Sequence, residues 1–432
     1  MKILTWTLIL LPALFLASRA QEVLSLEQAV SIGLERNHRI RIARNDAEIA
    51  RSETRRGTAG FLPTLDATGN LSFTSSQQET NSPFSFGDSD TRNASAQLAL
   101  NWTLFDGFRM FAEHDRLQQL ARLGASQARN VIEQTVMSIL GSYIQVVRQS
   151  QLLSVQESTL ALSRTRFEKA LVRHELGGSL SELLQARIAY HADSATALEQ
   201  KLQVAIARRN LNLAVGRDPQ TPFLTEETIN LPDFAYGLDE MLAMARKRNA
   251  ELDVARSSLE AAEAGTSLSH SAFYPRLSLF ATYGYADRLV DAPARGEITT
   301  LSADASVGLS LSFNLFDGFR NLADVERASL AEQNARLTLE EADLRLEGLL
   351  DEQSDTYRTR LQALDIEEIK RDAAQANLQL QIERFDTGTI SSLEFRDAQL
   401  QYIRAETSAI NARFAARIAL LELQRLIGEL QI

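Results

Sequence analysis

The fold of this chain is decided by the stretch Leu104-Phe105-Asp106-Gly107-Phe108-Arg109, because the same six residues recur at 315–320, an offset of 211. A second motif, Phe61-Leu62-Pro63-Thr64-Leu65, returns as Phe-Tyr-Pro-Arg-Leu at 273–277, an offset of 212. Solenoid repeats have periods of about 20–50 residues. A period this long therefore indicates that one subdomain has been duplicated.

The duplication predicts two structural repeats joined by a linker. We expect the first repeat at 21–216, the linker at 217–237 and the second repeat at 238–432, and the linker holds three of the eight prolines. Each repeat is expected to run as helix, β-hairpin, long helix and helix. The prolines fall outside the long periodic stretches, which suits continuous helices there.

Each repeat contains three stretches with helical periodicity and no helix breaker. These are 25–60, 107–175 and 180–215 in the first repeat, and 238–272, 318–386 and 391–428 in the second. Apolar residues in the long stretches follow the three-and-four spacing of coiled coils. At 1.5 Å per residue a long helix spans about 100 Å. Helices of that length must pack lengthwise, and we expect many of their partners to come from other chains.

Between the helices lie four segments in which apolar and polar residues alternate, the pattern of β-strands. They are 64–75, 93–104, 276–286 and 303–315. Each is close to the 9–11 residues that cross a bilayer as a strand, and the polar loops 76–92 and 288–302 would face outside the cell. Four strands cannot close a barrel, so the protomer must oligomerise. The polar inward faces favour twelve strands in a trimer over eight in a dimer.

Aromatic residues gather where these strands meet the helices. They are Phe61, Phe105, Phe273, Tyr274 and Phe316. The cluster resembles an aromatic girdle at a membrane interface. The alternative is a soluble β-sandwich, which leaves helices of this length unexplained.

Composition restricts the function further. The chain has no cysteine, so disulfides, thiolate metal sites and lipidation of an N-terminal cysteine are excluded. The net charge of −11 argues against a nucleic-acid partner. Residues 1–20 are predicted to be a signal peptide, with a retained N-terminal anchor as the alternative.

No catalytic constellation is present in the sequence. The five histidines are scattered, and none forms a zinc motif with a second histidine at the required spacing. We therefore expect no enzyme, no cofactor and no metal site. Asp106-Gly107 and Asp317-Gly318 stand where strand passes into long helix, and we assign them a structural role as helix N-caps with a flexible glycine.

Together these features resemble the TolC-like outer-membrane efflux protein family. The resemblance covers 21–432, and its markers are the duplicated Leu-Phe-Asp-Gly-Phe-Arg and Phe-x-Pro-x-Leu motifs and the stretch Phe385-Asp386-Thr387-Gly388-Thr389. It implies an α+β membrane protein, a trimer whose twelve-stranded β-barrel continues as a periplasmic α-helical barrel. The implied partners are outer-membrane lipid, a periplasmic adaptor protein, and an inner-membrane pump or ABC transporter.

The resemblance also implies two kinds of site at the inner end of the tunnel. The helix-tip turns would dock the adaptor, and their residues are Gly177, Gly178, Thr387, Gly388 and Thr389. Glu394 and Asp397, with Glu182 as the first-repeat counterpart of Glu394, would form an acidic ring at the tunnel entrance. The alternative for these acids is an ordinary solvated helix face.

The sequence departs from the family pattern at the entrance gate, where it has Phe385 and Ile390 in place of a tyrosine and an arginine. The predicted function is a passive export duct of a tripartite efflux or type I secretion system, located in the outer membrane and extending into the periplasm. The alternatives are a structural or adaptor-like periplasmic coiled-coil protein and an exported hydrolase. The sequence leaves the cargo open.

Overall fold

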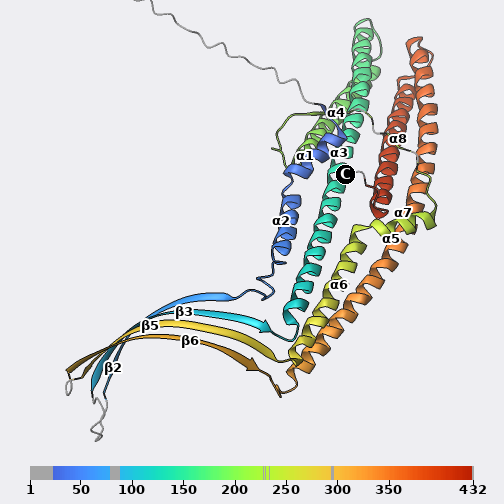
Figure 1. Cartoon of the computed structure of the whole chain (residues 1–432). Helices are drawn as coiled ribbons and strands as arrows, with labels where there is room; N and C mark the ends of the chain where they lie inside the picture. The colour runs from blue at the N-terminus through green and yellow to red at the C-terminus, as the bar shows by residue number, and fades with distance from the viewer. Residues whose placement is uncertain are drawn as a thin grey trace, which may run out of the picture.

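The computed structural model describes residues 23–77, 88–226, 228, 230–232, 234–292 and 296–430. The predicted signal peptide at 1–20 and residues 78–87 of the predicted outer loop lie outside these ranges. The molecule is elongated, with a curved β-sheet at one end and a bundle of helices that runs away from it (Figure 1). No helix within the described ranges is both long enough and apolar enough to cross a membrane.

Apart from the short elements β1 and η1, both repeats follow the same order of elements. The first contains β1 (Val23–Leu24), α1 (Leu26–Arg36), α2 (His38–Ser52), β2 (Thr64–Ser76), β3 (Ser89–Phe105), α3 (Arg109–Glu175) and α4 (Leu180–Ala214), and β4 (Leu224–Thr225) follows in the linker. The second contains α5 (Leu238–Arg248), α6 (Ala250–His270), the 3-10 turn η1 (Ser271–Phe273), β5 (Arg276–Ala292), β6 (Gly296–Ser312), α7 (Arg320–Asp386) and α8 (Ser392–Leu426). The long helices α3 and α7 both have 67 residues, and α4 and α8 both have 35. The predicted duplicated fold is confirmed.

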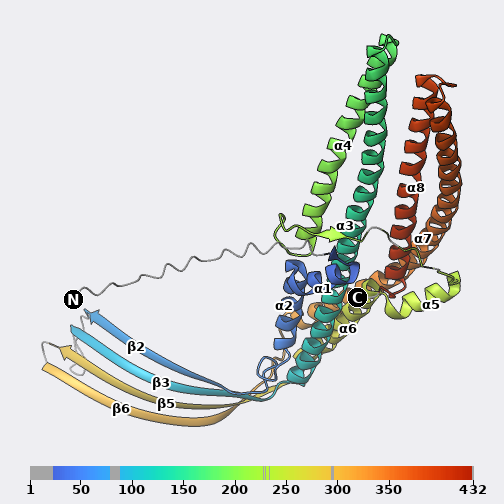
Figure 2. The same ribbon diagram turned by 90° about the horizontal axis from the view of Figure 1, so that it is seen from above.

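The four long strands form a single antiparallel sheet in the order β2-β3-β5-β6. Figure 2 shows this sheet standing clear of the helices, and no second sheet covers it among the described strands. Apolar side chains on it are exposed, including Phe73 at 72% and Val307 at 75%. The β-sandwich alternative is therefore wrong. The sheet has two unpaired edges in the protomer, β2 and β6.

The strands of the second repeat are longer than the sequence indicated. Most of the predicted loop 288–302 belongs to β5 and β6, which pair in register from Arg276–Ser312 to Ala292–Gly296. Charged residues such as Asp287 and Asp291 interrupt the apolar alternation that was used to bound the strand, although the backbone ladder continues past them. In the other direction, β6 ends at Ser312 rather than at residue 315.

The shorter helices are not continuous, which corrects the predicted helices at 25–60 and 238–272. Asn37 separates α1 from α2, and Asn249 separates α5 from α6. Each asparagine caps the second helix: Asn37 Oδ1 accepts the N–H of Arg39 at 2.8 Å, and Asn249 Oδ1 accepts that of Leu252 at 3.0 Å. A capping side chain offers the backbone a local alternative to helix, and this ends the first helix.

Each asparagine also ties its junction to the end of the neighbouring long hairpin. Asn37 Nδ2 donates to the carbonyl of Ala214 at 2.7 Å, where α4 ends, and Asn249 Nδ2 donates to that of Leu426 at 3.1 Å, where α8 ends. Both side chains are buried. In both repeats, one asparagine side chain thus caps the second short helix and also donates a hydrogen bond to a carbonyl at the end of the neighbouring long helix, which has no partner within that helix.

Removing this side chain should destabilise the middle of the molecule. Asn249→Ala is expected to lower the free energy of unfolding by about 1–3 kcal/mol, because a cap and a buried hydrogen bond are lost together. Thermal unfolding followed by circular dichroism checks this. Asn334→Ala, at an exposed position of α7, is the control and should leave the transition unchanged. Equal unfolding temperatures for Asn249→Ala and Asn334→Ala would contradict this stabilising role of Asn249.

Two apolar clusters hold the helices together at the level of these junctions. The first gathers Leu24, Tyr143, Leu211 and Phe223, and the Tyr143 hydroxyl donates to the carbonyl of Leu24 at 3.0 Å. The second gathers Met241, Leu350 and Leu420 with their neighbours. Beyond this level, the hairpins α3–α4 and α7–α8 extend side by side away from the sheet (Figures 1 and 2).

Candidate functional site

The ends of the two helical hairpins carry the predicted docking residues, and both have the same turn. Gly177 lies two residues after the end of α3 with φ 95°, and Gly388 lies two residues after the end of α7 with φ 75°. The next residue closes each turn: Gly178 N–H donates to the carbonyl of Arg173 at 2.8 Å, and Thr389 N–H to that of Arg384 at 2.9 Å. These are Schellman turns, in which glycine adopts the left-handed conformation at low cost.

The two turns differ in length by one residue. Ser179 caps α4 and directly follows Gly178, whereas Ile390 stands between Thr389 and the cap of α8, Ser391. The offset between the repeats therefore changes from 211 to 212 at Ile390.

The three predicted ring acids occupy different environments. Glu394 is exposed and forms a capping box with Ser391, accepting its backbone N–H at 2.8 Å. Those hydrogen bonds from Ser391 hold the pKa of Glu394 below its usual value. Asp397 is exposed one turn later and accepts from Gln401 Nε2 at 2.6 Å. Glu182 instead forms an ion pair with Arg173 at 3.1 Å.

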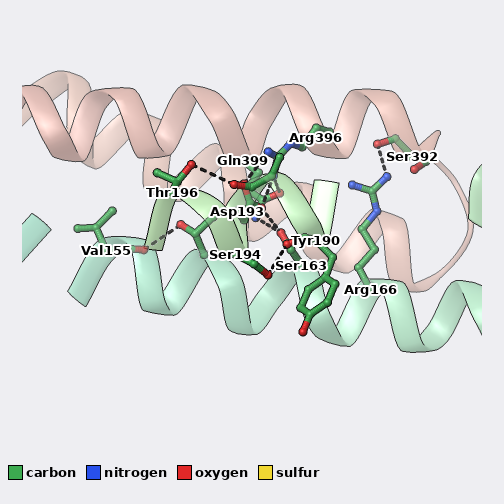
Figure 3. Close-up of polar contacts among 12 residues, drawn as sticks. Val155, Ser163, Arg166, Tyr190, Asp193, Ser194, Thr196, Ser392, Arg396 and Gln399 are labelled. Carbon is green, nitrogen blue, oxygen red and sulfur yellow. Dashed lines mark hydrogen bonds and ion pairs between the residues drawn. The ribbon is translucent and has the colours of Figure 1, made fainter. Parts of the chain in front are cut away.

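A polar network that the sequence analysis missed joins the two hairpins behind the tips. Arg396 of α8 makes two parallel hydrogen bonds to Asp193 of α4, at 2.7 and 2.8 Å. Ser163 of α3 also donates to Asp193, and Gln399 Nε2 of α8 donates to Ser163 Oγ at 3.2 Å. Figure 3 shows Arg396 reaching from α8 toward Asp193. We call these four residues the inter-hairpin lock.

The lock is largely shielded from water. Asp193 is 6% exposed, Ser163 2% and Gln399 1%. Bidentate pairs between guanidinium and carboxylate are the strongest hydrogen-bonded ion pairs in proteins, and breaking one in a buried setting leaves an uncompensated charge. The lock therefore stabilises the contact between the two hairpins. Removing either Asp193 or Arg396 alone would leave the other charge buried without its partner.

A signal for Asp193 was present in the sequence. The buried residues Ala186, Ala197 and Val204 mark the seam of α4, and Asp193 lies on it seven residues after the first and four before the second. A carboxylate on an otherwise apolar seam is costly unless it is paired. It could have been singled out, but the identity of its partner on α8, 203 residues away, could not.

Phe385, one of the two positions where the sequence departs from the family pattern, is packed between arginines. The guanidinium of Arg166 lies 5.5 Å from its ring centre and that of Arg173 lies 5.6 Å away. Arg166 also lies 5.3 Å from the ring of Phe395 and donates to the carbonyl of Ser392 at 2.8 Å. These cation–π contacts fasten α3 to the tip of the second hairpin.

The junction residues at the other end of the long helices are placed differently from the N-cap prediction. The N-caps of α3 and α7 are Phe108 and Phe319, both at positive φ. Asp106 lies two residues earlier and accepts the N–H of Met110 at 3.2 Å, while Asp317 accepts that of Asn321 at 2.8 Å. The carboxylates still satisfy first-turn N–H groups, but from outside the cap position.

The preceding glycines, Gly107 and Gly318, have φ of 73° and 72°. Around Gly107 the aromatic residues form a connected cluster, with Phe108 stacked edge-on against Phe105 at 5.4 Å and against Tyr274 at 6.3 Å.

Comparison with known families accounts for this arrangement. The profile described as outer membrane efflux protein matches residues 29–217 and 241–429. This chain belongs to the outer membrane efflux protein family. Cation efflux system protein CusC from Escherichia coli O157:H7 is 23% identical over 92% of this chain and 85% of its own length. Outer membrane protein OprJ from Pseudomonas aeruginosa is 26% identical over 93% of this chain and 84% of its own length.

Solved structures share the fold. The Campylobacter jejuni CmeC outer membrane channel superposes with a TM-score of 0.78 over 94% of this chain and 86% of that one, at 14% identity. The Neisseria gonorrhoeae MtrE outer membrane channel, at 19% identity, gives a TM-score of 0.72 over 94% of this chain and 89% of that one. The efflux protein is thus an outer-membrane channel subunit with helices that extend into the periplasm, and it is a component of transport. The adaptor-like coiled-coil alternative is set aside by this membership.

Proposed function

We propose that three copies of this chain form the exit duct of a tripartite pump that expels small molecules. The observation that carries the proposal is the single four-stranded sheet with unpaired edges β2 and β6 and exposed apolar side chains. Open strand edges are not tolerated in lipid, so β6 of one copy would pair with β2 of the next. Three copies give twelve strands, enough for a water-filled lumen.

Native mass measurement in mild detergent tests the assembly. The proposal expects a complex of three chains that persists at the lowest detergent concentration that keeps the protein soluble. A stable monomer or dimer as the principal species would contradict it.

The helix tips are the proposed docking surface for a periplasmic adaptor. Gly177, Gly178, Thr387, Gly388 and Thr389 form two turns at the end of the hairpins that is far from the sheet. Leu176, beside the first turn, is 83% exposed, and Leu393, beside the second, is 73% exposed. Exposed apolar side chains around a rigid turn suit a helix-tip partner. Energy for export would come from an inner-membrane pump, since the duct itself is passive.

Small molecules are the proposed cargo. Two of the relatives are named for a cation efflux system and for resistance to fusaric acid, and the cation efflux relative matches nearly the whole length of this chain. Export of unfolded proteins through a type I secretion system is the second candidate. Accumulation of small molecules in a deletion strain, measured together with its secreted proteins, separates the two.

Opening would require the α7–α8 tip to move away from α3–α4. The inter-hairpin lock and the arginine–phenylalanine contacts at Phe385 are the bonds that such a movement must break. Contact with an adaptor would favour the open arrangement by binding it more tightly than the closed one.

The acidic ring is proposed to make the inner mouth cation-selective, with Glu394 and Asp397 of each chain facing the entrance. Glu394→Gln with Asp397→Asn should reduce cation preference and divalent block in planar bilayers, because rings of carboxylates attract cations. Glutamine keeps the capping acceptor of Glu394, so the fold is retained.

The pH dependence of this cation selectivity follows from the lowered pKa of Glu394. A lowered pKa keeps the carboxylate ionised as pH falls through its usual value of 4.5, so its share of the selectivity should persist there and disappear only at lower pH. Asp218→Asn, at an exposed position of the linker, is the control. Unchanged selectivity in the double variant would refute the ring.

A further inference from the structure

A cavity lies at the junction of the two repeats, away from the tips. Its volume is about 750 Å³, and it opens between α1, α3 and α8. Most of its wall is apolar, with Leu26, Val30, Leu34, Leu140 and Leu421 among the lining residues, and the charged residues that line it are Glu27 and Arg417. Cavities of this size and character are typical of small-molecule sites in which a few polar groups set the orientation of the ligand.

One charged group in this cavity has two donor atoms without an acceptor. Arg417 lines the wall, and its Nε and Nη1 atoms are buried without a hydrogen bond. No carboxylate of the described residues forms an ion pair with it, and burial lowers the pKa of its guanidinium. A buried donor that finds no acceptor is costly, and more so when it is charged.

Arg148 and Arg208 each have one buried guanidinium nitrogen without a hydrogen bond, whereas Arg417 has two. Arg396, Arg413 and Arg425 each pair with a carboxylate, those of Asp193, Glu368 and Glu422. The first-repeat counterpart of Arg417, at the offset of 212, is Ala205. The first repeat therefore builds the equivalent helix without an arginine at this position.

We infer that this cavity binds a small amphipathic anion, a carboxylate or phosphate head on a short apolar tail. The head would accept hydrogen bonds from Nε and Nη1 of Arg417, and the tail would lie along Leu26, Leu34 and Leu421. Bidentate acceptance of two guanidinium N–H groups is the geometry that carboxylates and phosphates prefer. Gln424, on the same face of α8 and in the same wall, would supply a further donor to the head.

Occupancy would link the two repeats. The cavity wall takes residues from α1 and α3 of the first repeat and from α8 of the second. A ligand held between them would stabilise their present arrangement and would resist movement of α8. Binding itself does not depend on the proposed export function, and it is measured separately.

The test uses the full chain reconstituted in lipid nanodiscs, since free detergents are themselves amphiphiles. Labelled decanoate is titrated by equilibrium dialysis against wild type and Arg417→Ala in the same lipid, so that partition into lipid cancels in the difference. We expect one saturable site per chain and at least a tenfold loss of affinity in Arg417→Ala. Gln424→Glu, which places a carboxylate beside the guanidinium, should cause a similar loss.

Titrations with two further ligands separate the contribution of the anionic head of decanoate from that of its apolar tail. Decanol and inorganic phosphate should each bind at least tenfold more weakly than decanoate. Arg404→Ala, at an exposed position of the same helix, should bind decanoate like wild type. Decanoate affinity unchanged in Arg417→Ala, or equal affinity for decanol or for phosphate, would overturn the inference.

Thermal stability distinguishes a ligand-binding role of Arg417 from a role in packing. Without ligand, Arg417→Ala should unfold at the same or a higher temperature than wild type, because an unpaired buried charge is removed. Added decanoate should then raise the unfolding temperature of wild type and not that of the variant. A lower unfolding temperature for ligand-free Arg417→Ala would identify a packing role and contradict the site.

Discussion

Asp193→Ala is expected to open the inner mouth of the channel. The substitution removes both hydrogen bonds from Arg396, at 2.7 and 2.8 Å, and leaves its guanidinium without a carboxylate partner inside the inter-hairpin lock. Breaking a buried pair by removing one partner costs about 3–5 kcal/mol. At about 1.4 kcal/mol for each factor of ten, this would shift the balance between closed and open hairpins by about 100-fold or more. Single-channel conductance in planar bilayers should rise severalfold.

Two further variants separate opening from general damage. Arg396→Ala should raise conductance as Asp193→Ala does, and the double variant should add little, since the two residues act as one pair. Arg164→Ala removes an exposed ion pair with Glu168 on α3 and should leave conductance at the wild-type level. Wild-type conductance in Asp193→Ala, with trimers recovered in normal yield, would exclude the lock as a closing device.

Gly107→Ala is expected to prevent the protein from accumulating in the outer membrane, whereas Gly318→Ala should be tolerated. Both glycines have nearly the same positive φ, 73° and 72°, so the conformational strain of alanine is the same, about 1–2 kcal/mol. At Gly107 an added Cβ would also lie 2.4 Å from Cβ of Tyr274 and 2.6 Å from the carbonyl oxygen of Ser271. At Gly318 an added Cβ would meet nothing within 4 Å.

The duplication thus supplies a matched control inside one chain. The amount of trimer in purified outer membranes, compared for the two variants at equal expression, measures the difference directly. Equal losses would mean that the positive φ alone sets the requirement for glycine and that the close approach of η1 to α3 is unimportant.

The sequence was informative where a pattern extends over many residues. The repeat of Leu104–Arg109 predicted the duplication, and uninterrupted periodicity predicted α3 and α7 to within two residues at their start and at the correct residue at their end. Alternation located all four strands of the sheet. Such features depend on the average of many side chains, so single exceptions do not remove them.

The errors occurred where a single side chain decides the outcome. Asn37 and Asn249 occupy equivalent positions of the two repeats, but the helical periodicity on both sides of them gave no sign that each ends one helix and begins another. Asp106 and Asp317 resembled N-caps, yet the left-handed Phe108 and Phe319 hold that position. Positive φ at a non-glycine residue has no reliable sequence signal.

The inter-hairpin lock lay beyond the reach of sequence for a different reason. Its members come from three helices, and the contact between Asp193 and Arg396 spans 203 residues. Neither residue belongs to a local motif. Only the register of α8 against α4 places them together, and that register depends on the length of both tip turns, including Ile390.

Accumulation of small molecules in a strain that lacks this gene tests the central claim most directly. A panel of dyes, drugs and metal ions is measured in the deletion strain, with the secreted proteins scored in parallel, and the strain is complemented with wild type or Gly107→Ala. The export-duct account predicts raised accumulation of one or more small molecules, an unchanged set of secreted proteins, and restoration by wild type only. A missing secreted protein with normal accumulation of every small molecule would contradict the account.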